Sequence, residues 1–245
     1  MGSGKYSALA GAVSREQAMA SITNNLANVN STGFKKDRLS FESLLQDARQ
    51  TGEAKGVNYT RIRTIQPDLS PGPLRSTGSD LDLAIQGDGF FKVQDSQGNA
   101  YYTRKGSFMV NSNSELSTEE GHLVLGGSGG PVNLPTLGGK PVTIAEDGLV
   151  VLDGAEVGQV GLFAVEDPAK LVKTGNALFT LPADGAERPA ENTRIIQGHL
   201  ELSNVNMVEE MALMIDTTRK HETLHKVLKS YSTLAEKQDE LGTVS

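Results

Sequence analysis

The spacing of apolar residues changes along this chain, and that change limits the folds open to it. Near both ends, apolar side chains recur at intervals of three, four or seven residues, as on one face of an α-helix. From about residue 76 to 185, apolar and polar residues alternate, as in a β-strand with one buried face. This order predicts an α+β protein that is mainly β, with an antiparallel β domain inserted between N- and C-terminal amphipathic, coiled-coil-like helices.

The N-terminal segment 1–34 predicts the first helix and its ending. Ala12, Met19 and Leu26 recur every seven residues, which is the repeat of a coiled-coil seam. An Asn-rich stretch follows and reaches Gly33, and glycine accepts the left-handed backbone that often ends a helix. We therefore predict a helix that ends in an Asn-rich motif.

The C-terminal segment 203–245 predicts the second helix. Asn204 or Asn206 can cap its N-terminus, because an Asn side chain accepts hydrogen bonds from the free N–H groups there. Its apolar stripe consists of Val208, Met211, Ile215, Leu224, Val227, Tyr231, Leu234 and Leu241.

The charges of the two ends suggest what these helices pack against. Residues 1–38 carry five basic and two acidic side chains, whereas residues 201–245 carry five basic and eight acidic ones. Opposite charge favours pairing of the 203–245 helix with segment 1–34, or with neighbours in an assembly. The alternative is two solvated faces that merely differ in charge.

The middle of the chain predicts a domain of short strands over 76–185. Gly accounts for 27 of the 245 residues, and many of these lie in turn sequences such as Asp88-Gly89 and Asp147-Gly148. Many short strands joined by tight turns are typical of an antiparallel β domain. The proline-containing, polar stretches on either side predict an extended linker at 35–75 and a return linker at 186–202.

Composition excludes several classes of function. The chain has no Cys, which removes disulfides, thiolate metal sites and a cysteine nucleophile. A net charge of −7 with scattered Lys and Arg argues against a nucleic-acid partner. The apolar run Tyr6–Val13 is too short for a secretory signal or a membrane span. We expect no membrane insertion and no cofactor.

One motif in the sequence could instead indicate a catalytic metal site. His221-Glu222-Thr223-Leu224-His225 is a formal H-E-x-x-H, in which two His on one helix face bind Zn²⁺ and the Glu is a general base. The longer form of the motif needs Gly and His where this chain has Leu228 and Tyr231. A zinc metallopeptidase that uses His221, Glu222 and His225 is the alternative from another class, but we predict no catalytic, cofactor or metal-binding residue.

Five segments along nearly the whole chain carry a family resemblance. They are NNLANVNSTGFKK (24–36), IQGDGFFKV (85–93), YTRKGSF (102–108), GHLVLG (121–126) and SNVNMVEEM (203–211). Together and in this order they resemble the flagellar basal-body rod and hook proteins. The chain departs from the family at Ser114, where a strand turn in the family usually has Gly.

The resemblance implies a structural subunit rather than an enzyme. Such subunits are exported through the flagellar type III apparatus without cleavage of a signal peptide. They assemble helically with copies of themselves and with paralogous rod subunits into the drive shaft that crosses the periplasm and transmits torque. Chain length and the segment 121–135 are most similar to the proximal rod subunits, and the distal rod paralogue is the alternative. A surface-binding role for the β domain, adhesin-like or cap-like, is a third possibility.

We expect subunit contacts to come from the Asn-rich motif and the helix stripes. The predicted interface residues are Asn24, Asn25, Leu26, Asn28, Asn30, Gly33, Phe34, Asn204, Asn206, Met211, Ile215, Leu224, Val227, Tyr231 and Leu234.

Overall fold

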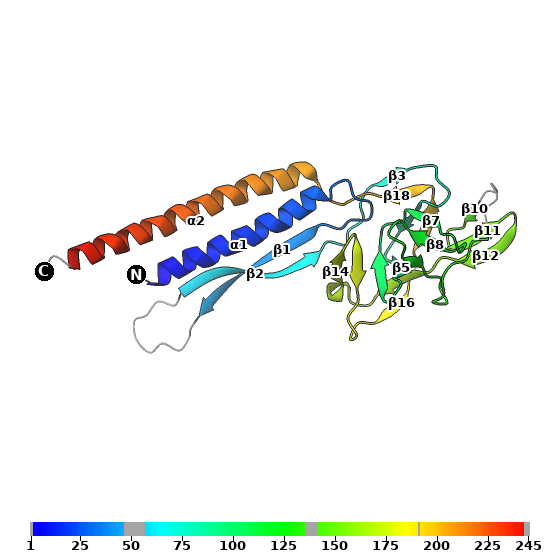
Figure 1. Cartoon of the computed structure of the whole chain (residues 1–245), viewed down its shortest axis with the longest axis horizontal. Coiled ribbons are helices and arrows are strands. Elements are labelled where there is room, and N and C mark those ends of the chain that lie inside the picture. The colour runs from blue at the N-terminus through cyan, green and yellow to red at the C-terminus, as the bar shows by residue number, and fades with distance from the viewer. Residues whose placement is uncertain (1, 47–56, 136–141, 191, 243–245) are drawn as a thin grey trace. The chain divides into compact units, whose positions relative to one another are not determined.

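The computed structural model divides the chain into two compact units, which we call the helical unit and the β unit (Figure 1). The helical unit consists of Met1–Ala27, Asp37–Gln66 and Asn206–Ser245. The β unit consists of Asn28–Lys36 and Pro67–Val205. The structure describes residues 2–46, 57–135, 142–190 and 192–242.

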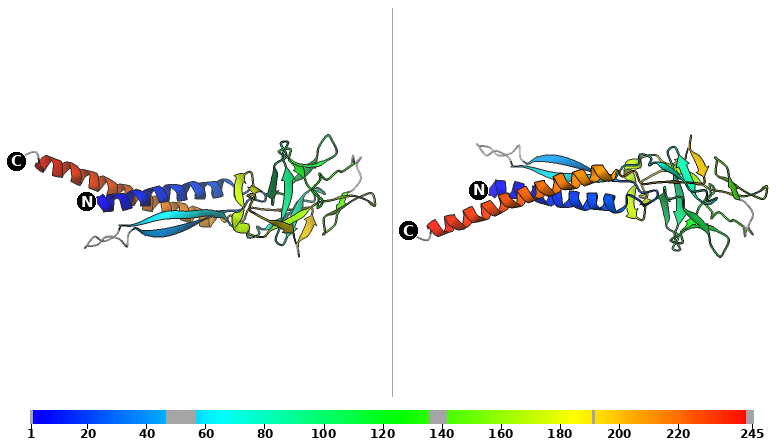
Figure 2. Two further views of the ribbon diagram at one scale, coloured as in Figure 1. Left: turned by 90° about the horizontal axis from the view of Figure 1, so that it is seen from below. Right: turned by 90° about the horizontal axis from the view of Figure 1, so that it is seen from above.

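Two helices and two strands form the helical unit. Helix α1 (Gly2–Ala27) and helix α2 (Met207–Gly242) pack against each other: they lie side by side in Figure 1 and cross in the views of Figure 2. Strands β1 (Asp37–Gln46) and β2 (Val57–Pro67) pair with each other, and β1 also contacts α1. In the described residues, neither helix is both long and apolar enough to cross a lipid bilayer. The chain is thus mostly β structure with one helix at each end, as the change in periodicity predicts.

The two helices run antiparallel along a seam of small residues on α1. A Cβ atom at Gly4 would stand 2.5 Å from the Tyr231 hydroxyl, and one at Gly11 would stand 3.2 Å from Leu224 Cδ1. Seven residues on, the same register places Ala18 opposite Thr217, and both are buried. Each small residue leaves room for a larger one on α2, so the helix backbones can approach closely. The facing pairs are Gly4 and Tyr231, Gly11 and Leu224, Ala18 and Thr217, and Asn25 and Glu210.

The β unit is built from short antiparallel strands. Its main sheet has the strand order β14-β15-β6-β5-β9-β8-β7, with β13 pairing with β5 and β16. Strands β10, β11 and β12 form a second sheet, while β17 pairs with β4 and β18 with β3. A 3₁₀ turn lies at Pro168–Lys170. The bounds are β3 Leu74–Ser76, β4 Leu83–Gln86, β5 Phe90–Gln94, β6 Ala100–Thr103, β7 Phe108–Val110, β8 Leu116–Thr118, β9 Leu123–Val124, β10 Val142–Ile144, β11 Leu149–Leu152, β12 Ala155–Gln159, β13 Leu162–Val165, β14 Val172–Gly175, β15 Leu178–Thr180, β16 Glu187–Pro189, β17 Arg194–Gln197 and β18 His199–Glu201.

Large aliphatic and aromatic side chains fill the centre of the β unit. Leu83, Phe91 and Leu116 are fully buried there, and the Phe91 ring meets the Phe108 ring edge-on at 5.1 Å between centroids. A smaller cluster surrounds Phe179. Burial of such side chains contributes about 1.5–3 kcal/mol each, so this unit has a substantial core of its own.

The two predicted linkers contain regular structure, and this corrects the expectation for 35–75 and 186–202. Within 35–75, β1 and β2 form a sheet of the helical unit, and β3 belongs to the β unit. The prolines that indicated a linker lie at and after the end of β2. Within 186–202, β17 and β18 pair with β4 and β3 and bury Ile195 and Leu200. Strands β1 and β2, with 10 and 11 residues, contain many polar side chains and so resemble a linker in composition, because the pairing of strands comes from backbone groups.

The turn at Ser114, which departs from the family, keeps a glycine-like backbone. Ser114 has φ 63°, in the left-handed region, and its N–H donates to the Asn111 carbonyl over 3.0 Å. Ser114 therefore adopts the left-handed backbone conformation without being glycine, although a side chain makes this conformation sterically unfavourable.

Candidate functional site

The first half of the Asn-rich motif forms a polar clasp within the helical unit. The Asn25 Oδ1 accepts from the Asp37 N–H over 2.9 Å, and the Asn25 Nδ2 donates to the Asp37 carbonyl over 3.2 Å. The same Nδ2 group also donates to the Glu210 carboxylate of α2 over 3.3 Å. Asn24 adds a bond to the Asp37 carboxylate over 3.3 Å, and Leu26 is half-buried beside them. Asn25 thereby ties α1 to both β1 and α2.

The second half of the motif, in the β unit, ends in a buried cluster of three charges. The Lys35 ammonium lies 2.5 Å from Glu201 Oε1, and the Arg104 guanidinium lies 3.2 Å from Glu201 Oε2. Lys35 and Glu201 are each only 1% exposed. Lys35 also donates to the Ser70 carbonyl over 2.7 Å, while Glu201 accepts from the Gly72 N–H over 2.9 Å. We call Lys35, Arg104 and Glu201 the buried charge cluster.

Burial and charge act against each other in this cluster. Loss of solvation lowers the pKa of Lys35 and the pKa of Arg104, while the adjacent Glu201 carboxylate raises both toward their ordinary values. Removal of one partner from such a group leaves an uncompensated buried charge. The cluster therefore fixes where segment 28–36 lies within the β unit.

Gly33, Phe34 and Asn204 complete this attachment. Gly33 has φ +68° and donates its N–H to the Glu201 carbonyl over 2.8 Å, and a Cβ there would overlap the backbone N of Lys105. The buried Phe34 ring lies 3.9 Å from the Lys173 ammonium. The Asn204 side chain accepts from the Lys36 N–H over 2.7 Å and donates to the Asp68 carbonyl over 2.8 Å. Only glycine fits at position 33, because of both its backbone angle and its close neighbour.

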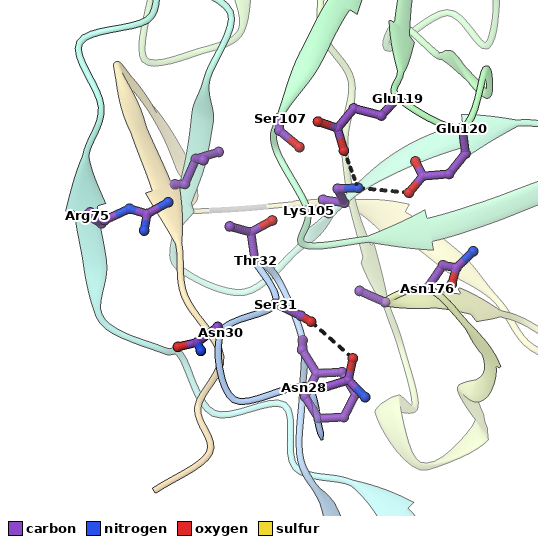
Figure 3. Close-up of a pocket in the computed structure, with 13 residues that line it drawn as sticks. Asn28, Asn30, Ser31, Thr32, Arg75, Lys105, Ser107, Glu119, Glu120 and Asn176 are labelled. Carbon is purple, nitrogen blue, oxygen red and sulfur yellow. Dashed lines mark hydrogen bonds and ion pairs between the residues drawn. The ribbon is translucent and has the colours of Figure 1, made fainter. Parts of the chain in front are cut away.

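A polar pocket of about 480 Å³ lies beside the same segment in the β unit (Figure 3). Asn28 accepts from the Ser31 hydroxyl over 3.0 Å at its rim, and Asn30 lines it with an exposed side chain. Lys105 bonds to Glu119 over 3.0 Å and to Glu120 over 2.8 Å. Burial lowers the pKa of Lys105, but the two carboxylates outweigh burial and raise it. Glu119 and Glu120 therefore neutralise the charge of Lys105.

The predicted contact residues on α2 divide between two faces. Leu224 and Tyr231 belong to the seam and are half-buried against α1. The other four are exposed: Met211 by 51%, Ile215 by 56%, Val227 by 39% and Leu234 by 52%.

Further large apolar side chains are exposed on both helices. Met207 and Val208 lie with Met211 and Ile215 on α2, and α1 exposes apolar residues at intervals of three and four. Residues at these intervals share one face of a helix. We call this set the exposed apolar stripes: Tyr6, Leu9 and Val13 on α1, and Met207, Val208, Met211 and Ile215 on α2.

Asn206, rather than Asn204, caps α2. Its Oδ1 accepts from the Val208 N–H over 3.1 Å and from the Glu209 N–H over 3.4 Å. The Asn204 side chain instead forms hydrogen bonds with Lys36 and Asp68 in the β unit. The sequence left both residues open because either precedes the helix within reach of its free N–H groups.

The H-E-x-x-H residues form no catalytic constellation in the part of the chain that the structure describes. His221 and His225 contact each other on α2. Among the described residues, no group of three or more His, Cys, Asp or Glu side chains is arranged to hold a metal ion. The zinc peptidase alternative requires a third ligand.

Sequence analysis missed the buried charge cluster and the small-residue seam. Lys35, Arg104 and Glu201 lie far apart in the chain, and nothing in their local sequence indicates burial. The seam had a readable signal, since Gly4, Gly11 and Ala18 recur every seven residues.

Two protein-family models match parts of this chain. The FlgE/F/G D1 domain of flagellar hook proteins matches residues 84–152, and the C-terminal domain of FlgEFG flagellar basal-body rod proteins matches 196–241. The flagellar basal-body rod protein FlgF of Caulobacter vibrioides is 35% identical over 216 residues, covering 87% of each chain. This chain belongs to the flagellar basal-body rod protein family. It is FlgF-like within that family.

Members named FlgG are similar over a comparable span. FlgG of Borreliella burgdorferi is 33% identical over 92% of this chain and 93% of its own. FlgG of Bacillus subtilis is 32% identical over 91% of this chain and 92% of its own. These relatives are structural rod proteins rather than enzymes, and neither matched family model describes a catalytic domain.

Proposed function

We propose that this chain is a proximal rod subunit that assembles helically, with copies of itself and with paralogous subunits, into the periplasm-crossing drive shaft of the flagellum. The observation that carries the proposal is the inverted polarity of the helical unit. Its seam buries the Ala18, Thr217, Asn25 and Glu210 side chains, while Met211 and Ile215 are more than half exposed. Exposed apolar patches of this kind are typical of interaction surfaces.

The length of α2 supports the same proposal. In the observed register, Gly2 lies opposite Thr233, so α2 runs past the first described residue of α1 over 234–242. Leu234 is exposed at the start of that extension. A single helix without packing partners is marginally stable in water. In an assembly, a neighbouring subunit would cover both the extension and the exposed apolar stripes.

Similarity favours FlgF over FlgG only slightly, so the place in the rod is part of the proposal. The distal rod subunit is the second candidate, because the FlgG relatives align over at least as much of the chain. Export without a cleaved signal peptide, through the flagellar type III apparatus, is proposed together with the rod role. Torque would pass from subunit to subunit through the packed helices.

Basal bodies from a strain that lacks the distal rod subunit test the position. A proximal subunit is already in place before the distal rod is added, so we expect this chain in basal bodies purified from that strain. If it is present only when the distal subunit is also made, the proximal assignment is wrong. If the chain is missing from intact basal bodies, the rod role itself is wrong. Detection with antibody against the untagged chain avoids interference with the ends of the helices.

A further inference from the structure

Two imidazoles on α2 lie unusually close together. His221 and His225 are one helical turn apart, and their Nε2 atoms are 3.2 Å from each other. The two ring centroids are 4.4 Å apart, with the ring planes at 69°. Residues spaced by four share one face of a helix, so the helix itself holds the pair in place.

The separation of the two nitrogens matches that of two ligands on one metal ion. Imidazole nitrogens bind transition metals at about 2.0–2.1 Å, so two of them lie about 2.9 Å apart at a right angle and about 3.4 Å apart at the tetrahedral angle. The observed 3.2 Å lies between these values. We propose that His221 and His225 together chelate one divalent transition-metal ion through their Nε2 atoms.

The chemistry of the pair selects the ion. Two neutral imidazoles favour Cu²⁺, Ni²⁺ and Zn²⁺, whereas Mg²⁺ and Ca²⁺ prefer oxygen ligands. In the hydrogen bond between the two rings one Nε2 carries the hydrogen, so metal binding needs the tautomer of that ring with its hydrogen on Nδ1, which leaves both Nε2 lone pairs for the metal. The helix places both nitrogens before the ion arrives, which reduces the ordering cost of chelation.

The surroundings of the pair define a two-residue site rather than a catalytic one. His225 is exposed and His221 is half-buried, so the ion remains in contact with solvent. Since no third His, Asp or Glu joins them within the described ranges, water completes the coordination. This site differs from the peptidase reading of the same motif, because Glu222 takes no part in it. It is independent of the proposed rod role.

Metal titration of the untagged full chain tests the proposal, with a matched control from the chain itself. The chain has four His, and the other two, His122 and His199, lie in the β unit. The test variant is His221→Ala with His225→Ala, and the control is His122→Ala with His199→Ala. Both lose two imidazoles, so nonspecific binding falls equally. Isothermal titration with Ni²⁺ and Zn²⁺, and with Mg²⁺ as the negative ion, measures binding.

We expect one Ni²⁺ or Zn²⁺ per chain for the natural protein and for the control. We expect at least a tenfold loss of affinity for the test variant, and no binding of Mg²⁺. With one equivalent of Cu²⁺, electron paramagnetic resonance should show coupling to two imidazole nitrogens, and this coupling should disappear in the test variant. Circular dichroism checks that α2 remains helical, and His225→Ala alone serves if the double variant unfolds. Equal affinity of test variant and natural chain overturns the proposal, as does binding that is lost in the control or absent altogether.

Discussion

The two units of this molecule bury opposite kinds of side chain. The β unit encloses large residues such as Phe91, Leu116 and Phe179, with almost no exposure. Along α1 the helical unit buries Ile22 but otherwise small or polar residues such as Ala8 and Ala18, while apolar side chains on both of its helices face solvent. Burial of large apolar side chains stabilises a fold far more than burial of small ones.

This difference in buried side chains indicates which unit can be stable alone. The β unit has a core that needs no partner. Helices α1 and α2 leave large apolar side chains such as Tyr6, Met211 and Ile215 more than half exposed, so we infer that much of the stabilisation of these helices comes from neighbouring subunits. Alterations in the β unit should therefore lower the stability of the single chain, whereas alterations of the exposed apolar stripes should affect assembly alone.

The largest effect on the single chain is expected at the buried charge cluster. Glu201→Gln removes the one negative charge of the cluster, which is the carboxylate adjacent to both Lys35 and Arg104. Loss of one partner from a buried ion pair costs about 3–5 kcal/mol. Urea denaturation followed by near-ultraviolet circular dichroism measures the loss. Glu119→Gln is the control, because Glu119 is largely exposed and should change stability by less than about 1 kcal/mol. Equal effects of the two variants would contradict the assigned role of the cluster.

A second expectation concerns the seam of the helical unit. Gly11→Leu places a large side chain where even a Cβ would lie 3.2 Å from Leu224. Overpacking of this kind costs about 1–3 kcal/mol, so α1 and α2 should separate at lower temperature. Thermal unfolding monitored by far-ultraviolet circular dichroism reports the change. Gln17→Leu, on the exposed side of α1, is the control and should leave the transition unchanged. An unaffected Gly11→Leu variant would mean that the helices do not approach closely there.

The clasp at Asn25 should have a smaller effect. Asn25→Ala leaves the Asp37 N–H and the Glu210 carboxylate without the Asn25 partner. An unsatisfied buried polar group costs about 1–2 kcal/mol at such a site. Hydrogen exchange at the C-terminal end of α1 should accelerate. Asn24→Ala, whose side chain is exposed, should cause no comparable change, and a similar response of both variants would show that burial is not the cause.

The smallest effect is a dependence on pH in the β unit. Burial raises the pKa of Glu187, but hydrogen bonds from Lys92 and Tyr102 outweigh burial and lower it below the ordinary value of 4.5. The unfolded chain therefore binds this proton more readily, and the contribution of Glu187 is present above pH 4.5 and lost as pH falls through the lowered pKa. Glu187→Gln should reduce the loss of melting temperature between pH 7 and pH 3. An unchanged loss would exclude Glu187 as its source.

Periodicity predicted the order of elements because helices and strands differ in the spacing of their buried residues. The strands at Val142–Ile144 and Leu149–Leu152, for example, lie within 76–185 and alternate between more and less buried side chains. The sequence could not reveal β1, β2 and β18, since edge strands are held by backbone hydrogen bonds that any side chain permits.

The candidate site was predictable only in part. Asn25, Gly33 and Asn204 were predicted as subunit contacts, and that stays a prediction; their contacts within the chain, such as Asn25 with Asp37 and Gly33 with Glu201, were not predicted. Partners such as these are brought together by the fold rather than by local sequence. Met211 and Ile215 were placed in one apolar stripe with Leu224 and Tyr231, but only Leu224 and Tyr231 lie against α1, while Met211 and Ile215 are exposed.

Assembly of a stripe variant is the most direct test of whether the exposed apolar stripes are subunit contacts. Met211→Asp with Ile215→Asp places two charges in the exposed apolar stripe of α2, and Val172→Asp with Met109→Asp places two at exposed apolar sites of the β unit. Each pair is expressed in a strain that lacks the natural chain, and purified basal bodies are probed for the variant. We predict that the stripe variant folds normally but is missing from basal bodies, while the β-unit variant is incorporated. Incorporation of the stripe variant at the natural level would show that the exposed apolar stripe of α2 is not a subunit contact.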